Sequence, residues 1–188
     1  MIGIDEVGRG CWAGPLLVVA ARQTDALPLG LKDSKKLSKK ARENFIEQIK
    51  QTCEIGEGWV TPAEIDELGL TGAMKLAVQR ALSVLPTPEG YNEKVIMDGS
   101  INYCPDKYTN VQCVPKADDL YPVVSAASIY AKVERDNYMA ELNGPYLNYQ
   151  FDKHVGYGTK LHLEMLKLHG ICDQHRLSFA PIKKLATI

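Results

Sequence analysis

The stretch Met1-Ile2-Gly3-Ile4-Asp5-Glu6-Val7-Gly8-Arg9-Gly10 predicts the first strand of the fold. Ile2 and Ile4 alternate with a glycine, which is typical of a half-buried strand. Two adjacent carboxylates, Asp5 and Glu6, follow where we expect that strand to end. Burying neighbouring carboxylates is unfavourable unless a cation compensates them, and Mg²⁺ and Mn²⁺ prefer carboxylate oxygens. The stretch predicts either a polar strand end or one edge of a metal site.

A glycine-rich turn follows the two carboxylates. Gly8 and Gly10 allow main-chain groups to approach a ligand closely, and the guanidinium of Arg9 matches the geometry of a phosphate. A polar turn explains these residues as well as a phosphate-binding turn does, so the rest of the chain has to decide between the two.

Length and composition predict one soluble globular domain. The chain has 188 residues, of which 45% are hydrophobic and 24% charged, as in ordinary soluble domains. No run is long and apolar enough to span a membrane, and the acidic start does not resemble a signal peptide. The five cysteines lack the paired spacing of a metal site. We therefore expect a single domain over residues 1–188 of a reduced, cytoplasmic protein.

The charges are unevenly distributed, although the net charge is −1. Residues 31–42 carry six cations, Lys35 and Lys36 among them, against one acid, and residues 153–184 carry six against two. Two basic stretches on an otherwise acidic chain could form a phosphate-binding face. Solvated helix surfaces are the alternative interpretation.

Hydrophobic periodicity predicts a mixture of strands and helices over the rest of the chain. We expect further strands at residues 16–21, 54–60, 94–99 and 111–114, and helices that begin at Ser38 and Thr61 or cover residues 122–142 and 159–169. The tight connection after the first strand predicts a hairpin with the second. This order of elements predicts a mixed sheet with helices on its faces, in an α/β or α+β domain.

Four acidic positions lie at strand ends or just before a helix: Asp5, Glu6, Asp98 and either Asp118 or Asp119. Such positions converge at one edge of an open sheet. Several carboxylates without cysteine or histidine indicate a hard-ion site, which could support phosphoryl chemistry with two ions. Acids at strand ends are common, so spacing alone does not decide this.

The histidines and one tyrosine have two interpretations each. His154, His162, His169 and His175 are separated by eight, seven and six residues, unlike the i, i+4 pair of a helical zinc motif. We therefore expect surface or phosphate-contact roles for them. Tyr157, between two glycines, either packs locally or stacks on a sugar or base.

Seven short stretches, spread over nearly the whole chain, belong together: Asp5-Glu6-Val7-Gly8-Arg9-Gly10, Asp33-Ser34-Lys35-Lys36-Leu37, Met97-Asp98-Gly99, Lys116-Ala117-Asp118, Ser125-Ala126-Ala127-Ser128-Ile129 with Ala131-Lys132-Val133, Gly156-Tyr157-Gly158-Thr159 and His175-Arg176-Leu177-Ser178-Phe179. In this order they resemble ribonuclease HII, the type 2 ribonuclease H family. Each stretch alone is a weak signal, whereas seven in order are highly specific.

The resemblance implies an α/β domain of the ribonuclease H-like fold. Its central mixed sheet would be flanked by helices, with a helical substrate-binding part at about residues 145–188. The resemblance also implies an endonuclease that cleaves the RNA strand of RNA–DNA hybrids and incises 5′ of single ribonucleotides in duplex DNA. Two Mg²⁺ or Mn²⁺ ions would promote hydrolysis to 3′-hydroxyl and 5′-phosphate ends. The enzyme would remove ribonucleotides and RNA primers from DNA.

The same resemblance assigns roles to individual residues. The catalytic, metal-binding carboxylates map onto Asp5, Glu6, Asp98 and Asp118. The substrate-binding residues map onto Gly8, Arg9, Gly10, Lys35, Lys36 and Tyr157. Main-chain groups of the glycine turn would recognise the 2′-hydroxyl of the ribose. The tyrosine would stack on the following sugar, where a further hydroxyl would not fit, and the lysines would hold duplex phosphates.

The departures from the family pattern are small. Val7 stands where alanine is usual, Cys11 and Trp12 occupy a variable position, and the short lead-in before Asp5 predicts a short or weakly held first strand. We expect a monomer without a clamp-binding tail after Pro181. The alternatives are another nuclease with the same acids, such as a junction resolvase, and a hybrid-binding module without catalysis.

Overall fold

A five-stranded mixed sheet forms the centre of the computed structural model, which describes residues 1–31, 37–86 and 92–186. The strands are β1 (Ile2–Val7), β2 (Leu16–Gln23), β3 (Cys53–Val60), β4 (Val95–Asp98) and β5 (Val111–Val114). Their order across the sheet is β3-β2-β1-β4-β5. β1 pairs antiparallel with β2, in the predicted hairpin, and parallel with β4.

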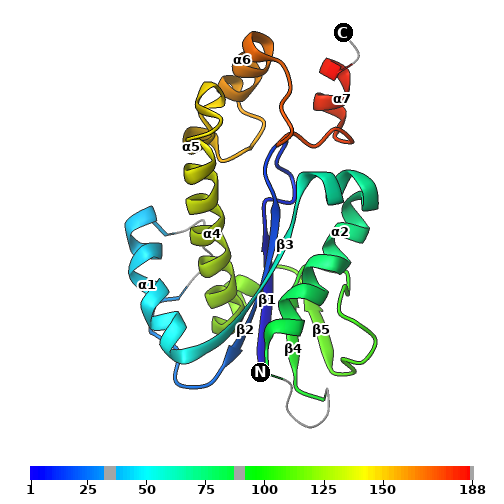
Figure 1. The fold of residues 1–188 in the computed structure, drawn as a ribbon. Coiled ribbons are helices and arrows are strands. Elements are labelled where there is room, and N and C mark those ends of the chain that lie inside the picture. The colour runs from blue at the N-terminus through cyan, green and yellow to red at the C-terminus, as the bar shows by residue number, and fades with distance from the viewer. Residues whose placement is uncertain (32–36, 87–91, 187–188) are drawn as a thin grey trace.

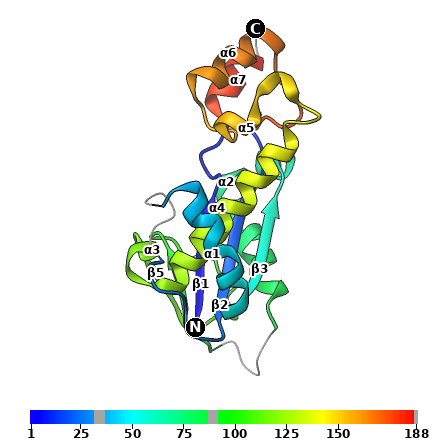
Figure 2. The same ribbon diagram turned by 90° about the vertical axis from the view of Figure 1, so that its left-hand side faces the viewer.

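Helices cover both faces of the sheet and gather beyond one end of it. They are α1 (Lys39–Thr52), α2 (Pro62–Val84), α3 (Ala117–Leu120), α4 (Pro122–Leu142), the 3₁₀ helix η2 (Leu147–Tyr149), α5 (Phe151–His154), α6 (Lys160–His169) and α7 (Ala180–Ala186). Figures 1 and 2 show α2 on one face and α1 and α4 on the other, with α5, α6 and α7 beyond the end at which β1 stops. The predicted α/β architecture and the helical C-terminal part are both present.

Local sequence signals explain where two of these helices begin. The hydroxyl of Ser38 accepts a hydrogen bond from the amide of Ala41, 3.2 Å away, at the start of α1. At the predicted start of α2, Thr61 and Glu64 form a capping box, in which each side chain bonds the other residue's amide. Gly69, at φ 66°, interrupts α2 with a kink.

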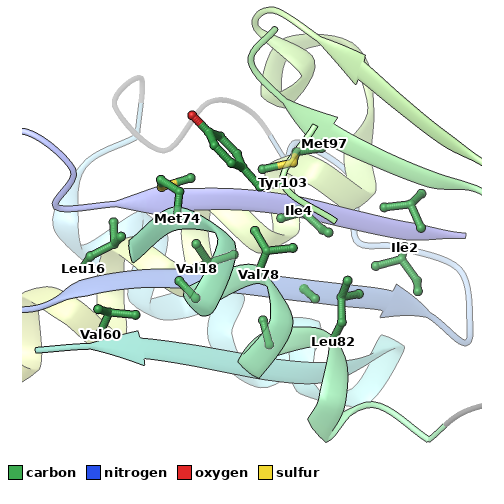
Figure 3. Packing of buried hydrophobic residues seen from close by; sticks show 14 of the residues in the cluster. Ile2, Ile4, Leu16, Val18, Val60, Met74, Val78, Leu82, Met97 and Tyr103 are labelled. Carbon is green, nitrogen blue, oxygen red and sulfur yellow. The ribbon is translucent and has the colours of Figure 1, made fainter. Parts of the chain in front are cut away.

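The core between α2 and the sheet consists of interlocking aliphatic side chains. Met74, Val78 and Leu82 of α2 face Ile4 of β1 and Val18 of β2 (Figure 3). All five are buried, with exposed fractions of 2% or less. Burying side chains of this size stabilises the fold by about 1.5–3 kcal/mol each.

β1 is buried on both of its faces, so the prediction of a half-buried strand was wrong. The opposite face is covered by α4, which approaches so closely that a Cβ added at Gly3 would lie 2.5 Å from the carbonyl carbon of Val123. Gly3 permits this approach because it has no side chain, and several of the residues that follow Val124 in α4 are also small. The strand is also neither short nor weakly held, since all six of its residues pair with β2 and the first three, residues 2–4, also pair with β4.

No helix in the described parts of the chain has both the length and the apolar character needed to cross a membrane.

Candidate active site

Two parallel strands place Asp5 and Asp98 next to each other. The last aligned pair of β1 and β4 is Ile4 with Met97, so the next residue of each strand is an aspartate. β1 continues to Val7 along β2. Asp5 and Glu6 therefore lie within β1, not at its end as expected. They lie just beyond the last residue of β1 that pairs with β4.

Burial and mutual repulsion act on these carboxylates. Burial raises the pKa of Asp5 well above its usual value, and the charges of Glu6 and Asp98 raise it further, while a hydrogen bond with Ser128 opposes the shift. Burial also raises the pKa of Glu6. Arg9 opposes that increase in pKa, because its Nη1 lies 3.6 Å from Oε1 of the glutamate. The cluster holds more negative charge than its protein neighbours compensate.

The fourth carboxylate is placed by a hydrogen bond between the end of β4 and the start of α3, which β5 separates along the chain. The amide of Ala117 donates a 2.7 Å hydrogen bond to Oδ1 of Asp98, which fixes the start of α3 beside the end of β4. Asp118 comes next and is only 7% exposed, whereas Asp119 is exposed. The hydroxyl of Ser125 donates to the main-chain carbonyl of Asp118 at 2.6 Å. Burial beside Asp98 favours Asp118 over its neighbour as the fourth site residue.

The donor set at this edge suits a hard divalent cation. Within the described residues, no three aspartate, glutamate, histidine or cysteine side chains are grouped closely enough to hold a metal ion as they stand. The carboxylates of Asp5, Glu6 and Asp98 nevertheless lie within the range at which their charges repel one another. Their oxygens are ligands that Mg²⁺ and Mn²⁺ accept. The residues therefore fit such an ion, with part of its ligand shell left to water or substrate.

A single pocket joins the buried carboxylates to the glycine turn and the tyrosine. Its volume is about 420 Å³, and its lining residues are Asp5, Glu6, Val7, Gly8, Arg9, Gly10, Ser128, Lys132 and Tyr157. The structure thus brings together six of the residues expected to form the site. Asp98 and Asp118 are not part of this lining. Asp98 nevertheless lies close enough to raise the pKa values of the two lining acids, Asp5 and Glu6. Lys35 and Lys36 lie outside the described residues.

Tyr157 is partly exposed and has two close polar neighbours, Cys11 and Lys132. The residue is 40% exposed, and its partial burial raises the pKa of the hydroxyl. The nearby thiol of Cys11 raises this pKa further. The ammonium group of Lys132 lies 5.8 Å from the ring centroid, within cation–π range. Tyr157 thus lines the pocket as a partly exposed aromatic side chain with these two neighbours.

Sequence reasoning assigned no role to Ser128 and Lys132, although both line the pocket. The signal was present in α4, where Ser125, Ser128 and Lys132 recur every three or four residues in a first half (residues 122–133) of otherwise small or apolar residues, and Asp136 follows at the same spacing. Lys132 lies 2.7 Å from Asp136, measured from Nζ to Oδ1. A polar stripe on a buried helix predicts a face that borders a site.

The expectation of surface roles was wrong for three of the four histidines. His154, His162 and His175 are buried, and only His169 is exposed. The rings of His154 and His162 stack with centroids 4.2 Å apart, and Nε2 of His162 lies 3.1 Å from Nε2 of His175. Aromatic neighbours such as Phe151 complete this cluster. Each imidazole has hydrogen-bond partners, which makes burial in the neutral form possible.

Comparison with known proteins is consistent with this geometry. The family model described as Ribonuclease HII matches residues 2–182. The Ribonuclease HII of Shewanella halifaxensis is 45% identical, over 97% of this chain and 88% of that protein. The ribonuclease HII of Archaeoglobus fulgidus, solved in complex with PCNA, is 30% identical, with a TM-score of 0.73 over 95% of this chain and 94% of that one.

A more distant solved structure shares the fold. Bst-RNase HIII, solved in complex with Mn²⁺, is 24% identical, with a TM-score of 0.71 over 99% of this chain and 68% of that one. Its likeness establishes the ribonuclease H-like fold alone. The match of the family model over nearly the whole chain and the identity to its relatives establish more: this chain is a member of the ribonuclease HII family, and thus an endonuclease of the ribonuclease H type.

Proposed function

We propose that this ribonuclease H endonuclease, which acts on RNA–DNA hybrids as its family does, also incises duplex DNA 5′ of a single embedded ribonucleotide. The substrate would be recognised at the junction between a ribonucleotide and the deoxyribonucleotide that follows it. Hydrolysis would leave a 3′-hydroxyl and a 5′-phosphate.

One observation carries the proposal. The pocket that contains Asp5 and Glu6 is also lined by Gly8, Gly10 and Tyr157. A ribose that meets the glycine turn would place its neighbouring phosphate beside the carboxylates and its 3′ neighbour beside the tyrosine. Main-chain groups can bond a 2′-hydroxyl, and an aromatic ring can stack on a sugar that lacks one.

The carboxylates would perform the chemistry with divalent ions. Asp5, Glu6, Asp98 and Asp118 would hold Mg²⁺ or Mn²⁺, which would activate water and stabilise the leaving oxygen. The charges of Glu6 and Asp98 act on Asp5, and a divalent cation would relieve this repulsion. The phosphate of the substrate could complete the ligand shell, so that binding and assembly of the site would depend on each other.

The cationic residues of the pocket would bind the backbone of the substrate. Arg9, whose side chain is 45% exposed, pairs with Glu6 at 3.6 Å and presents a planar fork to a phosphate. Lys132 adds a second positive charge beside Tyr157. Contacts of this kind are blind to sequence and weaken as salt increases.

The test uses a DNA duplex with one ribonucleotide, incubated with the protein and Mg²⁺ or Mn²⁺. A matched all-DNA duplex, an RNA–DNA hybrid and a chelator control are measured in parallel. We expect incision 5′ of the ribonucleotide, none in the all-DNA duplex, and none with chelator. Cleavage of the hybrid without incision at the single ribonucleotide would refute junction recognition while leaving the nuclease site intact.

The role of the tyrosine is tested by Tyr157→Ala and Tyr157→Phe. The alanine variant removes the ring and should lower kcat/KM at the single ribonucleotide by about tenfold or more. The phenylalanine variant keeps the ring and should retain most of the activity. If the alanine variant cleaves the junction as well as the original protein does, the tyrosine does not recognise the junction.

A further inference from the structure

Two arginines, Arg135 of α4 and Arg176 after α6, are completely buried. Among the residues that the structure describes, neither has an ion pair with a carboxylate. Burial, together with the nearby charge of Arg135, lowers the pKa of Arg176 to about 10, so the guanidinium is still charged at neutral pH. Burying an unpaired cation is strongly unfavourable unless hydrogen bonds replace its lost water.

The hydrogen bonds of both arginines go to main-chain carbonyls, and the segment after the glycine turn runs between them. Arg135 donates from Nε to Pro15 at 2.8 Å and from Nη2 to Ala13 at 3.3 Å. Arg176 bonds the intervening carbonyl of Gly14, from Nε at 3.0 Å and from Nη2 at 2.9 Å. The two side chains thus hold three successive carbonyls in alternation.

Each arginine also reaches one of the two elements that we expect to recognise the substrate. Nη1 of Arg176 donates to the carbonyl of Arg9 at 3.1 Å, inside the glycine turn. Nη1 of Arg135 donates to the carbonyl of Val155 at 2.8 Å, two residues before Tyr157. The pair therefore connects the glycine turn to the tyrosine through the segment that both arginines hold.

Main-chain bonds join the same segments, which leaves little freedom in their separation. The amide of Trp12 donates to the carbonyl of Gly156, and the amide of Arg176 donates to the carbonyl of Trp12, each at 2.8 Å. The approach is so close that a Cβ added at Gly156 would lie 2.2 Å from the carbonyl oxygen of Ala13.

We propose that Arg135 and Arg176 are positioning residues that set the separation between the glycine turn and Tyr157, and thereby choose the nucleotide at which the enzyme cuts. This inference rests on the proposed function. Both side chains are buried, so they would act through the main chain and not on the substrate itself. Lysine keeps the charge but lacks the planar fork that donates to several carbonyls at once.

The test measures where cuts fall, because the distribution of products does not depend on how much of a variant is folded. The substrate is a DNA duplex with four consecutive ribonucleotides in one strand, incubated with Mg²⁺ or Mn²⁺. The original protein should cut mainly 5′ of the last ribonucleotide, whose 3′ neighbour is a deoxyribonucleotide. Arg135→Lys and Arg176→Lys should each lower the ratio of that cut to the other cuts by about tenfold.

The matched control is Arg80→Lys. Arg80 also donates to a main-chain carbonyl, that of Trp59 at 2.6 Å, and it pairs with Glu64. It lies on α2, outside the pocket lining, so its variant should keep the original cut distribution.

Two results would overturn the proposal and are distinguishable from each other. If the arginine variants cut more slowly but with an unchanged distribution, the two residues support the fold without setting the register. If the original protein shows no preference for the last ribonucleotide, the proposed function fails first and this inference fails with it.

Discussion

Gly8 lies directly against the guanidinium of Arg135, so that a Cβ added at Gly8 would be 2.2 Å from Nε. A Cβ added at Gly10, in the same turn, would meet no atom within 4 Å. Gly8 also has φ +84°, which side chains rarely adopt, whereas no such constraint applies at Gly10. The fold therefore requires a glycine at position 8, whereas at Gly10 it leaves open space in which the proposed substrate would lie.

Alanine at each glycine separates these reasons. Gly8→Ala should lower the free energy of unfolding by about 1–3 kcal/mol, through strain and overpacking against Arg135. Gly10→Ala should leave that free energy within about 0.5 kcal/mol of the original value. It should nevertheless lower kcat/KM at a single ribonucleotide by about tenfold, because the new methyl group stands where the substrate approaches. Thermal unfolding and incision kinetics measure the two effects, and an active Gly10→Ala enzyme would contradict a close approach at this turn.

Removing one charge from the carboxylate cluster tests the metal site. Asparagine at position 98 can still accept the hydrogen bond from Ala117, so Asp98→Asn should fold normally and, without metal, should be no less stable. Incision should fall by about a hundredfold or more, as expected when electrostatic stabilisation at a reacting centre is lost. The rise in melting temperature on adding Mg²⁺ or Mn²⁺ should become smaller.

The matched control for that variant is Asp119→Asn, since Asp119 is exposed and lies next to Asp118. It should keep both the activity and the response to metal. Equal losses in the two variants would mean that the net charge of this region, and not a specific ligand set, supports the reaction.

Much of the site was predictable because most of its carboxylates directly follow apolar segments that are strong local signals of strands. Alternating apolar residues indicated β1 and a continuous apolar run indicated β4, and their parallel pairing brings Asp5 and Asp98 together. Periodicity could not show that β1 is covered on both faces, because that depends on how α2 and α4 pack. The choice between Asp118 and Asp119 likewise depends on burial, which the sequence alone leaves open.

The buried polar residues were the least predictable part of the chain. In a sequence, Arg135 and Arg176 look like surface cations, because charged side chains are seldom buried without an ionic partner. Their carbonyl partners lie in segments far away along the chain, and no local pattern reveals such contacts. The buried histidines were misplaced for the same reason.

The histidine cluster predicts a loss of stability in mild acid. Burial lowers the pKa values of His162 and His175 from 6.5 to about 4. As pH falls below about 6.5, the unfolded chain therefore binds protons before the folded protein does, and stability declines progressively until pH reaches about 4. The facing Nε2 atoms, 3.1 Å apart, accommodate one proton between them, which opposes protonation of both rings.

Urea unfolding between pH 7.5 and 4.5 measures this effect in the original protein and in His162→Gln. The variant should show a shallower decline of unfolding free energy with falling pH, whatever its stability at neutral pH. His169→Gln, at an exposed position, should keep the original slope. A slope that does not change in His162→Gln would show that other groups cause the acid sensitivity.

Lys132 should contribute a phosphate contact in the substrate complex. Its ammonium group lines the pocket beside Tyr157 and is partly neutralised by Asp136 in the free protein. Lys132→Gln should raise KM several-fold and reduce the slope of log affinity against log salt concentration by about one, as expected for the loss of one phosphate contact.

Lys75→Gln, an exposed change on α2, serves as the control of equal charge and should alter neither quantity. If both variants show the same salt dependence as the original protein, Lys132 orients Tyr157 without touching the nucleic acid, and its effect should then appear in the choice of cut position instead.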